Sequence, residues 1–131
     1  MSYLVAVNNM IKIPEKIPEK GFYYHYKHDP AGPVNNYAYE VLGAGHHTED
    51  DARPEDMNML VYRPLYESAG VYKAGKMFDL RPLHMFYEEV IKDGKTLPRF
   101  TKISDHKILA ELTARRELMY GKETRVLPKF D

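Results

Sequence analysis

Alternating apolar and polar positions predict that this chain is built mainly from short β-strands. In the aromatic segment 22–27, one face of a strand would carry Phe22, Tyr24 and Tyr26, and the opposite face Tyr23, His25 and Lys27. The strand pattern returns over residues 37–44 and 59–63, and Pro64 marks an end or an edge of the latter. Residues 3–7 are apolar and partly β-branched, which predicts a further short strand.

Turn residues divide the second half of the chain into equally short elements. Residues 74–76 predict a hairpin-like turn between strands at 71–73 and 77–81, and Gly43 and Gly45 favour a bulge. Pro82 opens a single helical turn through Phe86, and a strand over 86–91 follows. Asp93-Gly94 is a strong turn signal that leads to the segment 96–100.

The C-terminal region shows helical instead of strand periodicity. Ile108, Leu112 and Met119 lie on one stripe, with Leu109 close by, which predicts an amphipathic helix over 105–120. Ser104 is the expected N-cap and Gly121 the expected C-terminal cap. A helix of this length is unstable alone in water, so it must pack on its own domain or on a second copy.

About six short strands followed by one helix predict a mainly β fold, a small antiparallel barrel or roll with one C-terminal amphipathic α-helix. We expect one domain over 1–131, with an N-terminal extension (1–20), a β-roll core (21–103) and a helix with a tail (104–131). The extension contains Ile-Pro-Glu-Lys twice, which favours an extended connector. The expected core residues are Phe22, Tyr24, Val41, Leu60, Tyr62, Phe78, Leu80 and Phe86.

Composition narrows the class of protein. The chain has 131 residues and equal numbers of Lys plus Arg and of Asp plus Glu, 19 each, which argues against a nonspecific nucleic-acid binder. It has no Cys, so disulfides, thiolate nucleophiles and Cys-ligated metals are excluded. We find neither a signal peptide nor an apolar run of membrane-spanning length, and we expect a cytoplasmic protein without membrane partners. The 11 Tyr residues indicate half-exposed strands or a pocket.

Charge is zero overall but unevenly distributed. Residues 40–56 are acidic and carry a single base, Arg53, whereas residues 99–129 are predominantly basic. One interpretation is a mixed, solvated surface. The other is that the acidic loop meets the basic tail, within one chain or between two copies.

Histidines and a carboxylate supply one candidate site. His25, His46, His47 and Glu49 would form a metal site for zinc, nickel or iron if the strands 22–27 and 37–44 place them at the same end of the barrel. Against this, neighbouring side chains on an extended backbone point apart, which separates His46 from His47. The alternative is structural: one His hydrogen-bonds a strand end and another is solvated. We therefore expect no cofactor, with a divalent metal as the alternative.

Tyrosines and one arginine supply the other candidate site. Tyr62 and Tyr66 share a face and are expected to line a groove with other tyrosines of the strands, namely Tyr24, Tyr26 and Tyr39. The alternative is that these tyrosines are ordinary core and rim packing. Arg81 would pair with Glu49 or Glu40, or bind an anionic ligand. With His25, His46 and Glu49 at its mouth, this groove is the expected ligand-binding site.

Several segments of the chain resemble a small bacterial family known as domain of unknown function 1653. The segment 21–27 is similar to the family's opening Gly-x-Tyr-x-His-Tyr-Lys, and 80–86 to its Arg-Pro-x-x-Met-Phe signature. Segments 39–42, 44–49, 61–66 and 98–100 also resemble family segments, in the right order, over about residues 21–103. The departures are an expanded turn at 28–36, a longer and more acidic 46–58 loop, and Phe78 or Asp79 near the position of a Trp. The resemblance implies an SH3-like β-roll and no assigned activity.

Two hypotheses of function follow. The first is a non-catalytic binding or interaction module whose aromatic-lined groove takes a peptide, a small metabolite or a nucleic acid, nucleic acid being the less favoured. The second is a small metal-binding protein or metal-dependent enzyme that uses the His/Glu cluster. The sequence shows no convincing nucleophile or acid–base pair, so we expect no catalysis. A further hypothesis is that the chain forms a homodimer through its N-terminal segment or its C-terminal helix.

Overall fold

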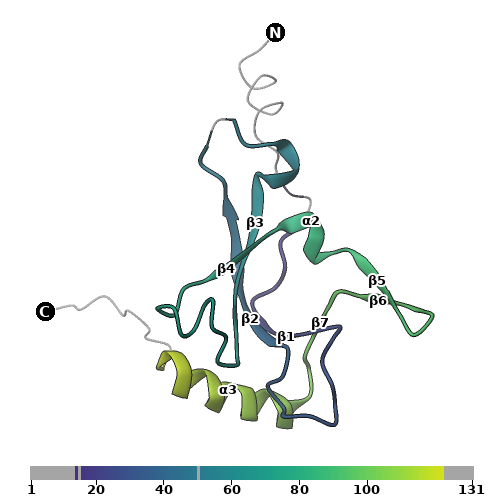
Figure 1. Ribbon diagram of the computed structural model, residues 1–131, viewed down its shortest axis with the longest axis vertical. Coiled ribbons are helices and arrows are strands. Elements are labelled where there is room, and N and C mark those ends of the chain that lie inside the picture. Colours follow the sequence, from purple (N-terminus) through teal and green to yellow (C-terminus); the bar gives the residue numbers. More distant parts are fainter. Residues whose placement is uncertain (1–13, 15, 50, 123–131) are drawn as a thin grey trace, which may run out of the picture.

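The computed structural model describes residues 14, 16–49 and 51–122, and this part of the chain is mainly β (Figure 1). No described helix is both long enough and apolar enough to cross a membrane. The elements follow one another in this order: β1 (Gly21–His25), β2 (Ala38–His46), the 3-10 helix η1 (Pro54–Asp56), β3 (Asn58–Pro64), β4 (Asp79–Pro82), α2 (Leu83–Phe86), β5 (Glu89–Lys92), β6 (Lys95–Pro98), β7 (Phe100–Lys102) and α3 (His106–Tyr120).

Five of the strands form one open antiparallel sheet in the order β4-β3-β2-β1-β7, and β5 and β6 form a separate hairpin. The helix α3 runs along one end of the sheet, and the β5–β6 hairpin projects from the side (Figure 1). The predicted mainly β fold with a C-terminal helix is confirmed. The described residues close no barrel, however, because β4 and β7 remain the two edges of the sheet.

Local sequence signals place most of these elements correctly. Lys92 pairs with Lys95 across a two-residue turn, in which Asp93 and Gly94 both have positive φ, as Asp-Gly predicts. The register of β2 against β3 shifts between Val41 and Gly43, which is the bulge expected of the glycines there. Pro64 ends β3, and α2 begins directly after Pro82. These features depend on only a few neighbouring residues.

Two local predictions have another outcome, and a third falls outside the described residues. Residues 71–73 form no strand, because β4 takes β3 as its partner instead of pairing back in a hairpin. The N-cap of α3 is Asp105 instead of Ser104, and its carboxylate accepts a hydrogen bond of 2.9 Å from the Ile108 N–H. The predicted strand at 3–7 lies outside the described residues.

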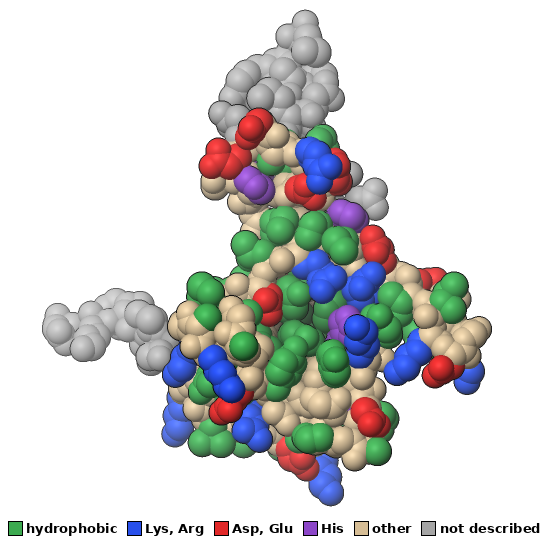
Figure 2. All heavy atoms as spheres, viewed as in Figure 1, with side chains coloured by type: hydrophobic (Ala, Val, Ile, Leu, Met, Phe, Trp, Pro, Cys, Tyr) green, Lys and Arg blue, Asp and Glu red, His purple; other side chains and the backbone are tan. Residues whose placement is uncertain are grey.

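The two faces of the five-stranded sheet bury different sets of side chains. One face, here called the aromatic face, carries a core that includes Tyr23, Val41, Leu60 and Tyr62 and is covered in part by α2. Phe86 of α2 packs there on Phe100, with ring centroids 5.1 Å apart. Beyond α2 this face is open to solvent, and Figure 2 shows hydrophobic side chains in the middle of the visible surface.

The opposite face, here called the helix face, is covered by α3. Leu112 of the helix is fully buried in a cluster with Ala38, Leu65 and Ile103. Ile108 and Leu109 pack against the same cluster. The predicted apolar stripe of α3 is therefore confirmed, and the helix packs on its own domain.

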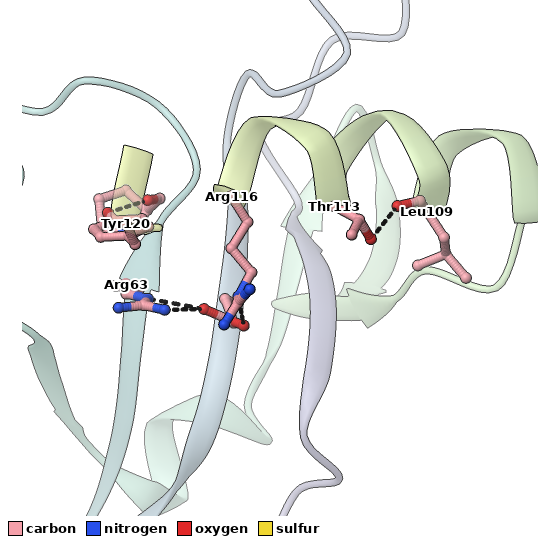
Figure 3. Close-up of polar contacts among 7 residues, drawn as sticks. Arg63, Leu109, Thr113, Arg116 and Tyr120 are labelled. Carbon is pink, nitrogen blue, oxygen red and sulfur yellow. Dashed lines mark hydrogen bonds and ion pairs between the residues drawn. The ribbon is translucent and has the colours of Figure 1, made fainter. Parts of the chain in front are cut away.

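A buried ion pair network fastens α3 to this face (Figure 3). Glu40 of β2 accepts hydrogen bonds from Arg63 of β3 and from Arg116 of α3, with closest N–O distances of 2.7 Å to each. The three side chains are only 12–13% exposed. The Tyr120 ring lies over the Arg63 guanidinium at 3.9 Å, and its hydroxyl donates to the Pro64 carbonyl at 2.5 Å. We call Glu40, Arg63 and Arg116 the Glu40 clamp.

The acidic stretch 40–56 therefore meets the basic C-terminal region at the Glu40 clamp. The loop that joins β2 to β3 lies at the opposite end of the molecule from α3 (Figure 1). Within the described part of one chain, this loop and the helix do not meet. Contact between two copies stays a prediction.

The expected core is correct on one side of the sheet and wrong at one edge. Val41, Leu60, Tyr62 and Phe86 are buried, and Phe22 and Tyr24 are half-buried against the α3 cluster. Phe78 and Leu80 are 52% and 61% exposed, because the edge strand β4 and the residue before it extend beyond the cluster that α3 covers.

Removal of the negative charge from the Glu40 clamp is expected to destabilise the fold strongly. Glu40→Gln leaves Arg63 and Arg116 together in a largely buried site without their counter-charge, so the free energy of unfolding should fall by about 3 kcal/mol. Urea denaturation followed by circular dichroism measures this loss. Glu117→Gln, an exposed change on α3, should cost less than about 0.5 kcal/mol. Equal losses in the two variants would contradict the proposed importance of the clamp.

Candidate functional site

Five chain segments contribute side chains to one ring-lined region of the aromatic face, which we call the aromatic site. Its rings come from the start of β2 with the residue before it, from β3 with the residues after it, and from β7. Its titratable or charged groups come from the end of β1, from β4 and from the residue before β7. Lys, Arg and His side chains border the hydrophobic group in the middle of Figure 2. The rings of the site are Tyr37, Tyr39, Tyr62, Tyr66 and Phe100, and the titratable or charged groups beside them are His25, Asp79, Arg81 and Arg99.

Tyr39 lies at the centre of the ring cluster. Its centroid is 5.4 Å from Tyr62, 5.6 Å from Tyr66 and 5.9 Å from Phe100, with interplanar angles of 58°, 81° and 82°. The hydroxyls of Tyr39 and Tyr66 are hydrogen-bonded to each other. Burial raises the pKa of both tyrosines, so both phenols stay neutral at physiological pH. They can supply ring surface and hydroxyl hydrogen bonds.

Arg81 reaches this ring cluster from the edge strand β4. Its Nε–H donates to the Tyr62 hydroxyl at 3.2 Å, and its guanidinium lies 5.7 Å from the Phe100 ring centroid. Among the described residues no carboxylate lies within ion-pair distance of it, although the side chain is half-buried. The terminal N–H groups of Arg81 are thus available to an anion.

Arg99 adds a second guanidinium from the residue before Phe100. One of its terminal nitrogens lies 3.2 Å from the Glu88 carboxylate, and its side chain is 19% exposed. Its Nε is buried and has no hydrogen-bond partner among the described residues. A buried N–H without a partner is costly. Because Nε is closed off from the surface, an outside ligand can meet Arg99 only through the exposed remainder of its side chain.

His25 lies beside both arginines at the end of β1. Its Nδ1 accepts a hydrogen bond of 3.2 Å from the Lys27 backbone N–H, which places the hydrogen of the neutral ring on Nε2. Burial, and then the positive charges of Arg81, Arg99 and Lys27, lower the pKa of His25 to about 4. The imidazole is therefore a neutral N–H donor at pH 7, in a region of positive potential.

Asp79 is the carboxylate of the site. It lies opposite Tyr62 in the β3–β4 register and two residues before Arg81, so it faces the same side of the sheet. Burial raises its pKa, and the charge of Arg81 opposes this shift. Among the described residues the carboxylate has no hydrogen-bond or ion-pair partner.

The structure brings together most of the residues predicted for the groove. His25, Tyr39, Tyr62, Tyr66 and Arg81 all belong to the aromatic site, where Tyr39 links Tyr62 and Tyr66 through direct ring contacts.

Of the other four predicted groove residues, three lie elsewhere, namely Tyr24, His46 and Glu49, and Tyr26 lies at the rim. Tyr24 belongs to the helix face, where its hydroxyl donates to the Val34 carbonyl at 2.6 Å. It is separated from Tyr62 because alternate residues of β1 point to opposite sides. Tyr26 lies at the rim of the site, with its ring centroid 4.4 Å from that of His25.

The expected pairing of Arg81 with Glu40 or Glu49 is wrong. Glu40 is on the helix face, where Arg63 and Arg116 bind it, and Arg81 points to the other face of the sheet. Of the two alternatives weighed for Arg81, the one in which it meets an anionic ligand stays a prediction.

The expected convergence of His25 with His46, His47 and Glu49 is also wrong. The β1–β2 pairing is antiparallel, with Tyr24 opposite Ala38, so His25 lies at the start of β2 and His46 at its end. A strand of nine residues separates the two by on the order of 25 Å. The Glu49 N–H donates to His47 Nδ1 within a local turn. Among the described residues no group of three His, Cys, Asp or Glu side chains is placed to hold a metal ion.

Sequence reasoning missed Arg99, Asp79, Tyr37 and Phe100 as members of the site. Phe100 lies in the segment 98–100, which resembles a family segment, but its position depends on the pairing of β7 with β1. Arg99 and Asp79 carry no local signal, because each becomes part of the site through strand register alone.

Comparison with known proteins gives one match. A family model described as protein of unknown function (DUF1653) matches residues 21–102, which comprise β1 to β7 and thus every residue of the aromatic site. No curated protein and no solved structure matches the chain.

The low pKa of His25 predicts that acid weakens the fold. In the unfolded chain His titrates near 6.5, whereas in the folded protein His25 titrates at about 4. The unfolded state therefore binds the proton first, and stability should fall as the pH drops from about 6.5 towards 4. Over this range His25 should lower the free energy of unfolding by on the order of 1–2 kcal/mol, a figure that allows for the partial exposure of its side chain. We expect His25→Gln to remove this contribution.

Urea denaturation at several pH values measures this effect. His46→Gln is the matched control, because His46 is exposed at the far end of β2 from His25, and this variant should keep the wild-type slope. A wild-type slope that persists in His25→Gln would contradict the assignment. Direct observation of the His25 ring by NMR would give its pKa independently.

Proposed function

Since the chain belongs to the DUF1653 family of proteins of unknown function, we propose from its site alone that it is a binding module for small anionic ligands. The observation that carries this proposal is the pair of guanidiniums at the aromatic site. Arg81 has free terminal N–H groups, and the positive charge of Arg99 lies beside the same imidazole, that of His25. The Arg81 guanidinium contacts the Phe100 ring, and Arg99 directly precedes Phe100 in the sequence.

The donors of the site suit an oxyanion. A carboxylate or a phosphate group accepts the paired N–H groups of a guanidinium, and such charge-assisted hydrogen bonds are stronger than neutral ones. The Nε2–H of neutral His25 is a further donor beside the same two charges. These groups support anion binding without any change in their protonation state at pH 7.

The rings suit a flat or apolar part of the same ligand. Tyr37 is 40% exposed, and a shallow pocket that includes Tyr37 and Tyr66 continues from the site towards Asn35 and Asn36. A ligand that places its anionic group at Arg81 would lie with its remaining atoms on these rings. The proposal therefore concerns ligands with an oxyanion and a compact apolar or aromatic group.

The same geometry favours binding over catalysis. Tyr39 and Tyr66 have raised pKa values and hydrogen-bond each other, and His25 uses Nδ1 to accept from the backbone. Within the described part of the site, no nucleophile is hydrogen-bonded to a base. We keep the cytoplasm as the expected compartment, on the grounds of composition.

Benzoate is a suitable probe because it joins a carboxylate to a flat ring. We expect benzoate, titrated into the isotopically labelled protein, to shift the backbone NMR signals of β1, β4 and residues 99–100. Benzamide, of the same shape but without charge, should bind at least about tenfold more weakly. Arg81→Gln and Arg99→Gln should each weaken benzoate binding by about tenfold, because each removes charged donors.

The control variant is Arg115→Gln, which removes the same charge from the exposed surface of α3 and should leave benzoate binding unchanged. Benzoate binding that is absent, or that survives both substitutions in the site, would refute the proposal. Tight binding of an RNA oligonucleotide with a steep salt dependence would instead support a nucleic-acid interface.

A further inference from the structure

The geometry points to a zwitterion as the ligand of the aromatic site: a molecule that carries an ammonium group close to its carboxylate or phosphate. This inference rests on the proposed function, since it assigns the anionic end of the ligand to Arg81 and Arg99. It adds a second subsite for the cationic end, at Asp79 and the tyrosine rings beside it.

Asp79 is placed where a ligand cation would meet it. It stands opposite Tyr62 on the aromatic face, and its charge acts on the hydroxyls of both Tyr39 and Tyr66. The carboxylate is half-buried, and among the described residues it has no hydrogen-bond or ion-pair partner. A carboxylate that has lost part of its hydration without gaining a partner favours a cation.

Tyrosine rings beside Asp79 offer π surface to a cation. Tyr39 and Tyr66 meet at 81°, and Tyr37 and Tyr66 at 53°, with centroids 5.6 and 6.2 Å apart. Tyr37 is 40% exposed and lines a shallow pocket with Tyr66, and exposed π faces attract ammonium groups. Quaternary ammonium groups gain most from such surroundings, because they are weakly hydrated and have no N–H groups to satisfy.

The two subsites are one ligand length apart. Asp79 and Arg81 are separated by two residues on the same side of β4, which corresponds to roughly 7 Å between their Cα atoms. Side chains at this spacing can contact the opposite ends of a small molecule. A purely anionic ligand at Arg81 is repelled by Asp79, whereas a zwitterion is attracted at both ends.

Glycine betaine and 3,3-dimethylbutyrate test this inference directly. The two have nearly the same shape and the same carboxylate, but only betaine carries a positive nitrogen in place of the central carbon of the tert-butyl group. We expect the wild-type protein to bind betaine about tenfold more tightly than its carbon isostere, as measured by NMR titration. This comparison needs no variant, so it does not depend on the folding of a mutant.

Asp79→Asn should change the two affinities in opposite directions. Loss of the carboxylate should weaken betaine binding by about tenfold and strengthen 3,3-dimethylbutyrate binding several-fold, because the repulsion of the anion disappears. Glu117→Gln removes the same charge from the exposed surface of α3 and should alter neither affinity. Circular dichroism verifies that both variants are folded.

The possible failures are distinguishable. If betaine binds no more tightly than its isostere, or if Asp79→Asn changes both affinities in the same direction, Asp79 serves only as a counter-charge for Arg81 and the inference is refuted. In that case benzoate binding through Arg81 and Arg99 would still support the proposed function. If benzoate does not bind either, the proposed function and the inference are both wrong.

Discussion

The Glu40 clamp is the interaction on which the rest of the architecture depends. A single carboxylate on β2 binds one guanidinium from the neighbouring strand and one from α3, and all three side chains are nearly buried. Burial of these charges is costly, so the arrangement is stable only while all three partners are present. The clamp thereby restricts α3 to one position on the helix face, where Leu112 packs with Ala38, Leu65 and Ile103.

The clamp and the aromatic site occupy alternate positions of the same two strands. Glu40 follows Tyr39 on β2, and Arg63 follows Tyr62 on β3, so the clamp residues point to one face and the tyrosines to the other. A one-residue slip of either strand would move Arg63 or Glu40 into the tyrosine cluster. The ion pairs therefore define the strand register that assembles the aromatic site on the reverse side of the sheet.

That reverse side differs from the helix face in how its charges are satisfied. On the helix face each guanidinium of the clamp binds Glu40, whereas on the aromatic face Arg81, the Nε of Arg99 and Asp79 have incomplete sets of partners among the described residues. These charged groups with unused hydrogen-bonding capacity lie beside neutral tyrosines, and together they form a preorganised polar surface. This contrast between two faces of one sheet is the physical basis for placing the binding function on the aromatic face.

Local chemistry along the chain was sufficient to predict most of the elements, because these depend on neighbours in sequence. The Asp93-Gly94 turn, the bulge near Gly43, the stop at Pro64 and the apolar stripe of α3 all follow from backbone freedom or from periodicity. The tyrosines expected to line one groove include Tyr39, Tyr62 and Tyr66, which contact one another on the aromatic face, but also Tyr24, which lies on the helix face. The chain's resemblance to its family was likewise visible in short segments of sequence.

Tertiary structure alone decided which charged groups meet. Antiparallel pairing of β1 with β2 placed His25 far from His46, and the choice of β3 as the partner of β4 brought Asp79 and Arg81 beside Tyr62. Glu40 met Arg116, 76 positions away, instead of Arg81, because the helix returns to only one face of the sheet. Contacts of this kind depend on strand register and layer packing, which are properties of the whole fold, and no single segment of the sequence encodes them.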